Sequence, residues 1–135
     1  VIENVSLPLR ITGASGGEIR RSCENGLRTV GLDGFSNRNA SELSGGELRR
    51  VAIARAIVSK PEILLADEPT GNLDSKSGVE IMKIFDDLHR QGNTIILVTH
   101  EEYIAEHADR TIHIFDGKVK EDIVNHKKRR EPVPV

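Results

Sequence analysis

Two adjacent carboxylates and one histidine follow apolar segments of the sequence and could take part in one reaction. Asp67 and Glu68 come directly after residues 63–66, and His100 comes shortly after residues 94–98. One carboxylate can hold Mg²⁺ through water, a second can orient or deprotonate a water molecule, and a histidine can donate to a phosphoryl oxygen. These are the parts of a phosphoryl-transfer site. The alternatives are a pair of loop carboxylates that cap a helix and a polar surface histidine.

A second candidate site begins at Ser44, which Gly45, Gly46 and Glu47 follow. Ser44 stands where a helix N-cap belongs, and Glu47, three residues later, can complete a capping box. Each glycine costs about 1 kcal/mol relative to alanine in a helix, so two in the first turn suggest that something bulky approaches the backbone. Free N–H groups, the helix dipole and the serine hydroxyl would bind an anion such as phosphate. A capped surface helix with a flexible start is the alternative.

A parallel sheet is needed to bring the acidic pair and the histidine together. Residues 63–66 and 94–98 are continuous apolar runs, which are typical of strands buried on both faces. Residues 75–91 between them have the apolar spacing of a helix, and such strand–helix–strand units cross over right-handed. Because ligands bind at the carboxyl ends of strands in open α/β sheets, we expect His100 to emerge on the same edge as the two acids.

Helices are predicted on the N-terminal side of this unit. A first helix is expected to end near Pro8, a second to span residues 18–30 with Gly31 as its C-cap, and a third to run from Ser44 to about Ser59. The glycine-rich stretch between the first two lacks the spacing and the lysine of a phosphate loop, and is interpreted as a connector.

A short helix and a hairpin are predicted on the C-terminal side. The helix would span residues 101–108, and residues 110–115 and 118–123 would pair about Asp116-Gly117, which is a strong hairpin signal. Residues 125–135 form a basic, proline-containing tail that is expected to be disordered. Contact of this tail with anionic lipid headgroups is the weaker alternative.

The composition excludes several classes of protein. A hydrophobic fraction of 37% with 30% charged residues is ordinary for a soluble globular protein. Aromatic residues make up 3% and the net charge is −2, which argues against nucleic acid as a partner. A lone cysteine, Cys23, allows no internal disulfide and fits a reducing compartment. No apolar run is long enough to span a bilayer.

The order and spacing of five motifs resemble the ATPase subunit of ATP-binding-cassette (ABC) transporters. The motifs are residues 43–47, 50–56, 63–70, 73–74 and 99–100. The resemblance extends from Val1 to about Lys120, and residues 68–75 are similar to the branch of lipoprotein-release, macrolide-export and cell-division ATPases. It implies the C-terminal part of a P-loop NTPase-type α/β fold. Residues 1–60 would be a helical subdomain, and residues 61–124 a partial nucleotide-hydrolysing core that ends in a hairpin.

The resemblance implies that one group of residues acts across a dimer of ATPase subunits. Ser44, Gly45, Gly46 and Glu47 would form the signature motif, which contacts the γ-phosphate of ATP bound on the partner subunit. Asp74 would lie in the loop that crosses to this partner. The second subunit would be identical or different, and an integral membrane subunit would carry out transport, which places the chain on the cytoplasmic face of the cell membrane.

A second group would act on ATP and Mg²⁺ directly. By the resemblance, Asp67 would hold Mg²⁺ through water, Glu68 would be the general base for the attacking water, and His100 would contact the γ-phosphate. The family often has Gln where this chain has Glu47. We expect Arg49 or Arg50 to neutralise that carboxylate.

The phosphate-loop motif with its lysine is not among the 135 residues, nor are the adenine-stacking aromatic residue and the glutamine loop. The chain therefore looks like the second part of an ATPase domain, and alone it would expose strand edges and bind ATP weakly. A different hypothesis is a non-catalytic module that lends its signature helix to a complete partner. An ABC-type ATPase of chromosome maintenance or translation is disfavoured, because residues 69–74 look like those of export transporters.

Overall fold

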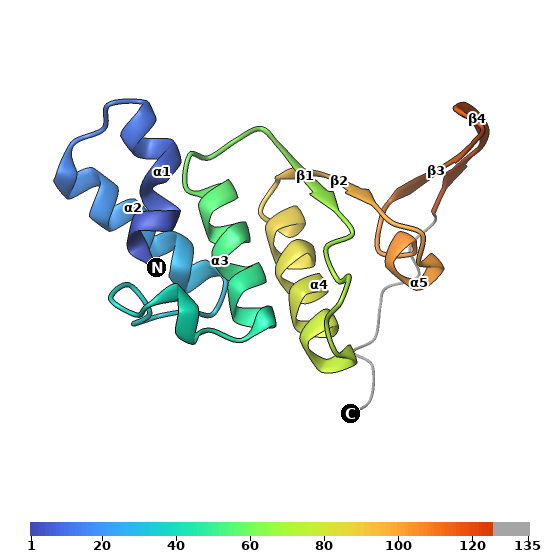
Figure 1. The fold of residues 1–135 in the computed structure, drawn as a ribbon. Coiled ribbons are helices and arrows are strands. Elements are labelled where there is room, and N and C mark those ends of the chain that lie inside the picture. Colours follow the sequence, from blue (N-terminus) through green and yellow to red (C-terminus); the bar gives the residue numbers. More distant parts are fainter. Residues whose placement is uncertain (126–135) are drawn as a thin grey trace.

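The computed structural model describes residues 1–125, which form a group of helices followed by two small sheets (Figure 1). The elements are α1 (Ile2–Ile11), α2 (Gly16–Thr29), the 3₁₀ turn η1 (Ala40–Glu42), α3 (Gly45–Ile57), β1 (Ile63–Asp67), α4 (Ser75–Arg90), β2 (Thr94–Val98), α5 (Glu102–Ala105), β3 (Arg110–Phe115) and β4 (Lys118–Val124). The tail prediction falls almost wholly on residues 126–135, which lie outside the described residues.

Helices α1, α2 and α3 pack around a small apolar core. Val5, Cys23, Leu27 and Ala54 come from all three helices and are at most 1% exposed. Gly26 of α2 lies against α3, where a Cβ at this position would come to 3.4 Å from the Ala54 carbonyl oxygen, an ordinary contact distance. Burial raises the pKa of the Cys23 thiol, because the thiolate is disfavoured away from water.

The prediction that the first helix ends near Pro8 is wrong, because α1 continues to Ile11. Proline removes one N–H donor and strains the preceding turn, at a cost of about 3 kcal/mol. The buried Val5 before it and the half-buried Leu9 after it both pack into the helical core. This burial holds the helix together across the proline, and the Thr12 N–H closes the last turn on the Pro8 carbonyl at 3.4 Å.

Helix α2 begins two residues earlier than predicted. Ser15 is its N-cap, and the Ser15 N–H donates to Oε2 of Glu18 at 3.1 Å in a capping box. Gly16 and Gly17 therefore lie in the first helical turn and not in the connector. The predicted stop is confirmed, since Gly31 follows the helix with φ +73°.

Strands β1 and β2 pair in parallel, from Ile63 opposite Thr94 to Asp67 opposite Val98. Helix α4 covers one face, where Leu64 is buried and packs into the same core as Met82 and Phe85. The prediction that these strands are buried on both faces is wrong for the described residues. Leu65 is 78% exposed on the opposite face, and Ile63, Ile96 and Val98 are exposed beside it.

The predicted hairpin forms from β3 and β4, which pair antiparallel with a register shift between His113 and Ile114. Asp116 and Gly117 have φ of +46° and +71°, as a tight hairpin turn requires. In residues 1–125, β2 and β3 belong to separate two-stranded sheets. None of the helices in this part of the chain is both long and apolar enough to cross a membrane.

Candidate functional site

Glu68 and His100 meet at the carboxyl ends of β1 and β2. The Nδ1–H of His100 donates to Oε1 of Glu68 at 2.7 Å, and the His100 backbone N–H donates to the same oxygen at 3.1 Å. The Thr99 hydroxyl donates to Oε2 of Glu68 at 3.3 Å. The expectation that the histidine and the acids share one edge of the sheet is therefore met, and Asp67 ends β1 on this edge as an exposed residue.

The two charges stabilise each other. The hydrogen bond from His100 lowers the pKa of Glu68, and the same bond raises the pKa of His100. The side chain of His100 is 83% exposed and that of Glu68 is 36% exposed. Both groups are thus ionised at mildly acidic pH and open to a molecule that approaches the sheet edge.

The backbone at Glu68 is strained. Its φ is +44°, in the left-handed region that costs non-glycine residues free energy and that clusters at functional sites. The Glu68 N–H donates to the Val98 carbonyl at 2.8 Å, so the chain leaves the sheet immediately after its last ladder bond. The turn continues with the Gly71 N–H donating to the Glu68 carbonyl at 3.1 Å.

Thr99 and Thr70 are polar residues near this edge that belong to the predicted motifs but had no role assigned from the sequence. The Thr99 hydroxyl also accepts from the Glu101 N–H at 3.0 Å, which ties the residue after His100 back to the strand end. Thr70 is 5% exposed, and its hydroxyl donates to Oε1 of Glu101 at 3.4 Å. A threonine directly before the candidate histidine was the available signal for the first of them.

The helix start at Ser44 has the predicted capping box. The Glu47 N–H donates to Oγ of Ser44 at 3.3 Å, and the Ser44 N–H donates to Oε2 of Glu47 at 2.8 Å. The hydrogen bonds from Ser44 are the main reason that the pKa of Glu47 is lowered, with smaller contributions from the charges of Arg38 and Arg50. The expected neutralisation by Arg50 is present, whereas Arg49 extends to the Gly71 carbonyl.

The two signature glycines have different surroundings. A Cβ at Gly46 would lie 3.1 Å from Oγ of Ser77, so this glycine is needed where α3 and α4 touch. A Cβ at Gly45 would lie 3.8 Å from Leu73, which is an ordinary contact, and Gly45 is exposed. Of these two glycines, Gly45 is the one that an external molecule could reach.

Asp74 caps α4 beside the signature motif. Its Oδ1 accepts from the Ser77 N–H at 3.0 Å, and its Oδ2 accepts from the Ser77 hydroxyl at 2.6 Å. These bonds lower the pKa of Asp74. The predicted site residues thus fall into two groups: Glu68 and His100 at the sheet edge, and the starts of α3 and α4, which lie side by side at one end (Figure 1).

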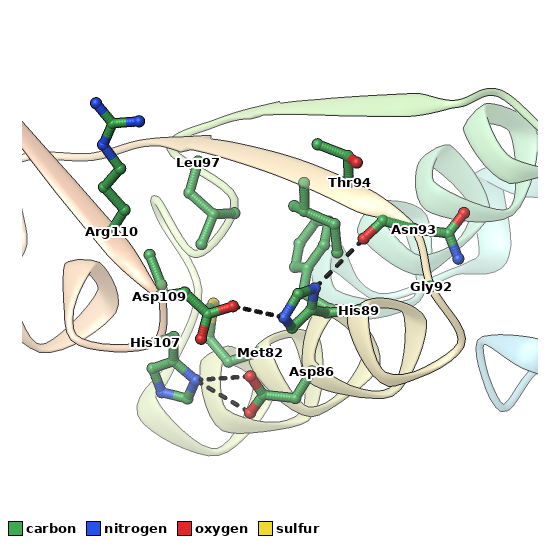
Figure 2. Close-up of a pocket in the computed structure, with 13 residues that line it drawn as sticks. Met82, Asp86, His89, Gly92, Asn93, Thr94, Leu97, His107, Asp109 and Arg110 are labelled. Carbon is green, nitrogen blue, oxygen red and sulfur yellow. Dashed lines mark hydrogen bonds and ion pairs between the residues drawn. The ribbon is translucent and has the colours of Figure 1, made fainter. Parts of the chain in front are cut away.

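A pocket of about 350 Å³ lies apart from both groups, between α4, β2 and the segment that leads into β3 (Figure 2). His89 contacts Asp109 (Nε2–Oδ2 2.8 Å) and His107 contacts Asp86 (Nδ1–Oδ2 3.1 Å), so two histidine–carboxylate hydrogen bonds join α4 to this segment. Sequence analysis did not predict these pairs. Among residues 1–125 there is no group of three side chains that could hold a metal ion.

A family model described as "ABC transporter" matches residues 1–71, which is more than half of the chain. The chain belongs to the ABC transporter family. It is 50% identical over 122 residues to the macrolide export ATP-binding/permease protein MacB of Chlorobium luteolum, and 50% identical over 131 residues to that of Chlorobaculum tepidum. These matches cover 90% and 97% of this chain but 18% and 20% of the relatives.

Solved family members have the same fold. A dimeric post-hydrolysis structure of the ATP-binding cassette MJ0796 bound to ADP and Pi matches with a TM-score of 0.78 at 39% identity. A second dimeric structure of MJ0796, described as a bacterial ABC transporter cassette, matches with a TM-score of 0.79 at 40% identity. The match covers 93% of this chain and 56% of each cassette. The predicted α/β fold of P-loop NTPase type and the resemblance to macrolide-export ATPases are confirmed.

Proposed function

We propose that this chain forms the signature and hydrolytic part of the ATP-binding cassette of a MacB-like ABC transporter. The observation that carries the proposal is the hydrogen bond between Glu68 and His100 at the carboxyl ends of parallel strands, next to Asp67. The solved cassette that shares this fold is bound to ADP and Pi. Residues 1–60 would be the helical subdomain and residues 61–124 the hydrolytic core.

Glu68 is suited to act as the general base. It is a carboxylate at neutral pH and its side chain is partly exposed at the sheet edge, so it can orient an attacking water and accept its proton. Because Nδ1 of His100 contacts Glu68, the other ring nitrogen, Nε2, is the atom that would contact the γ-phosphate. Asp67 offers the oxygen ligand that Mg²⁺ prefers, and the ion would neutralise charge on the phosphates.

The start of α3 would serve a second ATPase subunit, identical or different. Ser44 and Gly45 are exposed at a capped helix N-terminus, which attracts anions. Both solved cassettes that share the fold are dimeric. Asp74 lies beside them and would enter the same interface. The conformational change that accompanies hydrolysis would be transmitted to an integral membrane subunit or permease region.

The exposed apolar face of the β1–β2 sheet supports the proposal that another part of the cassette packs against it. Ile63, Leu65, Ile96 and Val98 place four apolar side chains in water, and soluble proteins rarely leave such a patch without a partner. We expect the phosphate-loop portion of the cassette to cover this face and to supply the backbone cradle for the β- and γ-phosphates. Without it, the chain would bind ATP weakly.

The test is hydrolysis by a joined cassette, in which this chain follows the phosphate-loop portion of the Chlorobaculum tepidum relative. We expect measurable ATP turnover that Glu68→Gln lowers by at least about 100-fold, because the amide cannot accept a proton. Glu62→Gln, at an exposed residue just before β1, is the matched control and should retain turnover. Turnover unaffected by Glu68→Gln would contradict the assignment of the base.

The second candidate function is a non-catalytic module that lends its signature helix to a complete partner. The observation that favours it is that Ser44 and Gly45 are exposed at the start of α3, where a partner could contact them. Mixing the chain with a complete MacB cassette separates the two functions. A stimulation that Ser44→Arg abolishes would favour the module, and an absence of stimulation at every ratio would exclude it.

A further inference from the structure

Arg49 reaches from the signature helix to the loop that follows Glu68. Its Nη2 donates to the Gly71 carbonyl at 3.2 Å, across 22 positions of sequence and in partly buried surroundings. The neighbouring arginines of α3 have other partners: Arg50 pairs with Glu80 on α4, and Arg55 donates to Asn4 on α1. Arg49 is thus the α3 arginine that holds the loop between Glu68 and Asp74.

Gly71 is hydrogen-bonded both to Arg49 and to the backbone of Glu68. The Gly71 N–H donates to the Glu68 carbonyl at 3.1 Å, so the residue whose carbonyl Arg49 contacts is itself hydrogen-bonded to the backbone of Glu68. Glu68 and Asn72 both have positive φ, +44° and +61°. For Glu68, unlike asparagine, this conformation persists only where surrounding contacts impose it, and the guanidinium supplies a charged donor for that purpose.

The same segment of α3 touches the loop and α4 on both sides of Asp74. Gly45 lies against Leu73, and Gly46 lies against Ser77 so closely that a Cβ would approach Oγ to 3.1 Å. A displacement of the signature motif would therefore move the loop, and a change in the loop would move the signature motif.

We propose that Arg49 is a positioning residue for Glu68. It holds the loop of residues 68–74 so that the Glu68 carboxylate stays on His100, and it connects the signature motif to the general base of the same chain. The inference has a structural half, that Arg49 holds the loop, and a catalytic half, that it thereby positions Glu68 for hydrolysis. The catalytic half rests on the proposed function. A change in the signature motif, which is proposed to face the nucleotide of the partner subunit, would in this way change the position of Glu68 in the same chain.

The structural half is tested by hydrogen exchange in the joined cassette. The amides of Gly71 and Leu73 donate within the loop, so their exchange rates report its opening. We expect Arg49→Ala to accelerate both about tenfold, as loss of one charge-assisted hydrogen bond implies. Arg49→Lys keeps the charge and a donor and should recover part of the protection. Arg55→Ala is the matched control, since Arg55 contacts Asn4 and not the loop.

The catalytic half is tested by ATP turnover and its pH profile. Arg49→Ala should lower kcat about tenfold with less than a twofold change in KM, and should move the acidic limb of the kcat profile to higher pH. The reason is that a displaced Glu68 loses the His100 hydrogen bond that lowers its pKa. The Lys variant should lie between wild type and Ala.

Exchange rates at Gly71 and Leu73 that match those of Arg55→Ala would overturn the inference, whatever the activity. Accelerated exchange with an unchanged kcat and pH profile would overturn its catalytic half. If the parent joined cassette shows no turnover, the proposed function fails, while the exchange measurement still decides whether Arg49 holds the loop. A general loss of protection in all helices would mark Arg49→Ala as unfolded, and the comparison would then pass to Arg49→Lys.

Discussion

Exchanging the two signature glycines for alanine, one at a time, should change stability in opposite directions. A Cβ at Gly46 would lie 3.1 Å from Oγ and 3.3 Å from Cβ of Ser77, which is closer than side chains normally pack. Overpacking of this kind costs about 1–3 kcal/mol, and the gain from replacing a helical glycine is about 0.5–1 kcal/mol. Gly46→Ala should therefore destabilise the protein by as much as about 2.5 kcal/mol.

Gly45→Ala should have the opposite effect, because the nearest atom to its new Cβ would be Leu73 Cδ2 at 3.8 Å. It gains helix propensity without a clash, so the free energy of unfolding should rise by as much as about 0.5–1 kcal/mol. ATP turnover should nevertheless fall in Gly45→Ala, since the methyl group would occupy the space proposed for the nucleotide of the partner subunit.

The assay is urea unfolding of the joined cassette, followed by circular dichroism, with the Ser77→Ala exchange as a second background. Removing Oγ of Ser77 takes away the closest clash, so the penalty for Gly46→Ala should shrink in that background while the effect of Gly45→Ala stays the same. Equal unfolding midpoints for the two glycine variants, or a larger penalty at Gly45, would show that the α3–α4 contact does not govern this position.

Two further predictions concern the sheet edge and the exposed sheet face. The Glu68–His100 pair should contribute its full stabilisation between the ordinary pKa values of the two groups, 4.5 and 6.5; it should be lost as pH falls through the lowered pKa of Glu68 or rises through the raised pKa of His100. In an NMR titration Glu68→Gln should lower the pKa of His100, and an unchanged value would disprove the pairing. Leu65→Lys should reduce aggregation of the separate chain, measured by light scattering, but should lower the unfolding midpoint of the joined cassette. An unchanged unfolding midpoint of the joined cassette would contradict the proposal that the phosphate-loop portion covers the sheet face that carries Leu65.

Much of the site was predictable because local chemistry determines it. The spacing of Ser44 and Glu47 specifies a capping box, and Asp116-Gly117 specifies a tight turn, without reference to the rest of the chain. The meeting of Glu68 and His100 follows from two apolar runs that end on one edge of a parallel sheet.

What the sequence did not indicate depends on contacts between distant segments. Gly46, predicted as part of the signature motif, also makes room for Ser77, 31 positions later in the sequence. The sequence left open whether Arg49 or Arg50 acts on Glu47; Arg50 does so, and Arg49 instead donates to the Gly71 carbonyl. Pro8 does not end its helix because burial on both sides outweighs a local preference. Spacing along the chain carries no information about these packing partners.

The position of Cys23 gives the protein an internal reporter. It is the single cysteine in the sequence, its side chain is fully buried among α1, α2 and α3, and burial raises its thiol pKa. Thiol reagents attack the thiolate of an accessible cysteine. We therefore expect Cys23 to be labelled only when these three helices separate. The rate of labelling therefore measures how often the packing of these three helices around Cys23 opens.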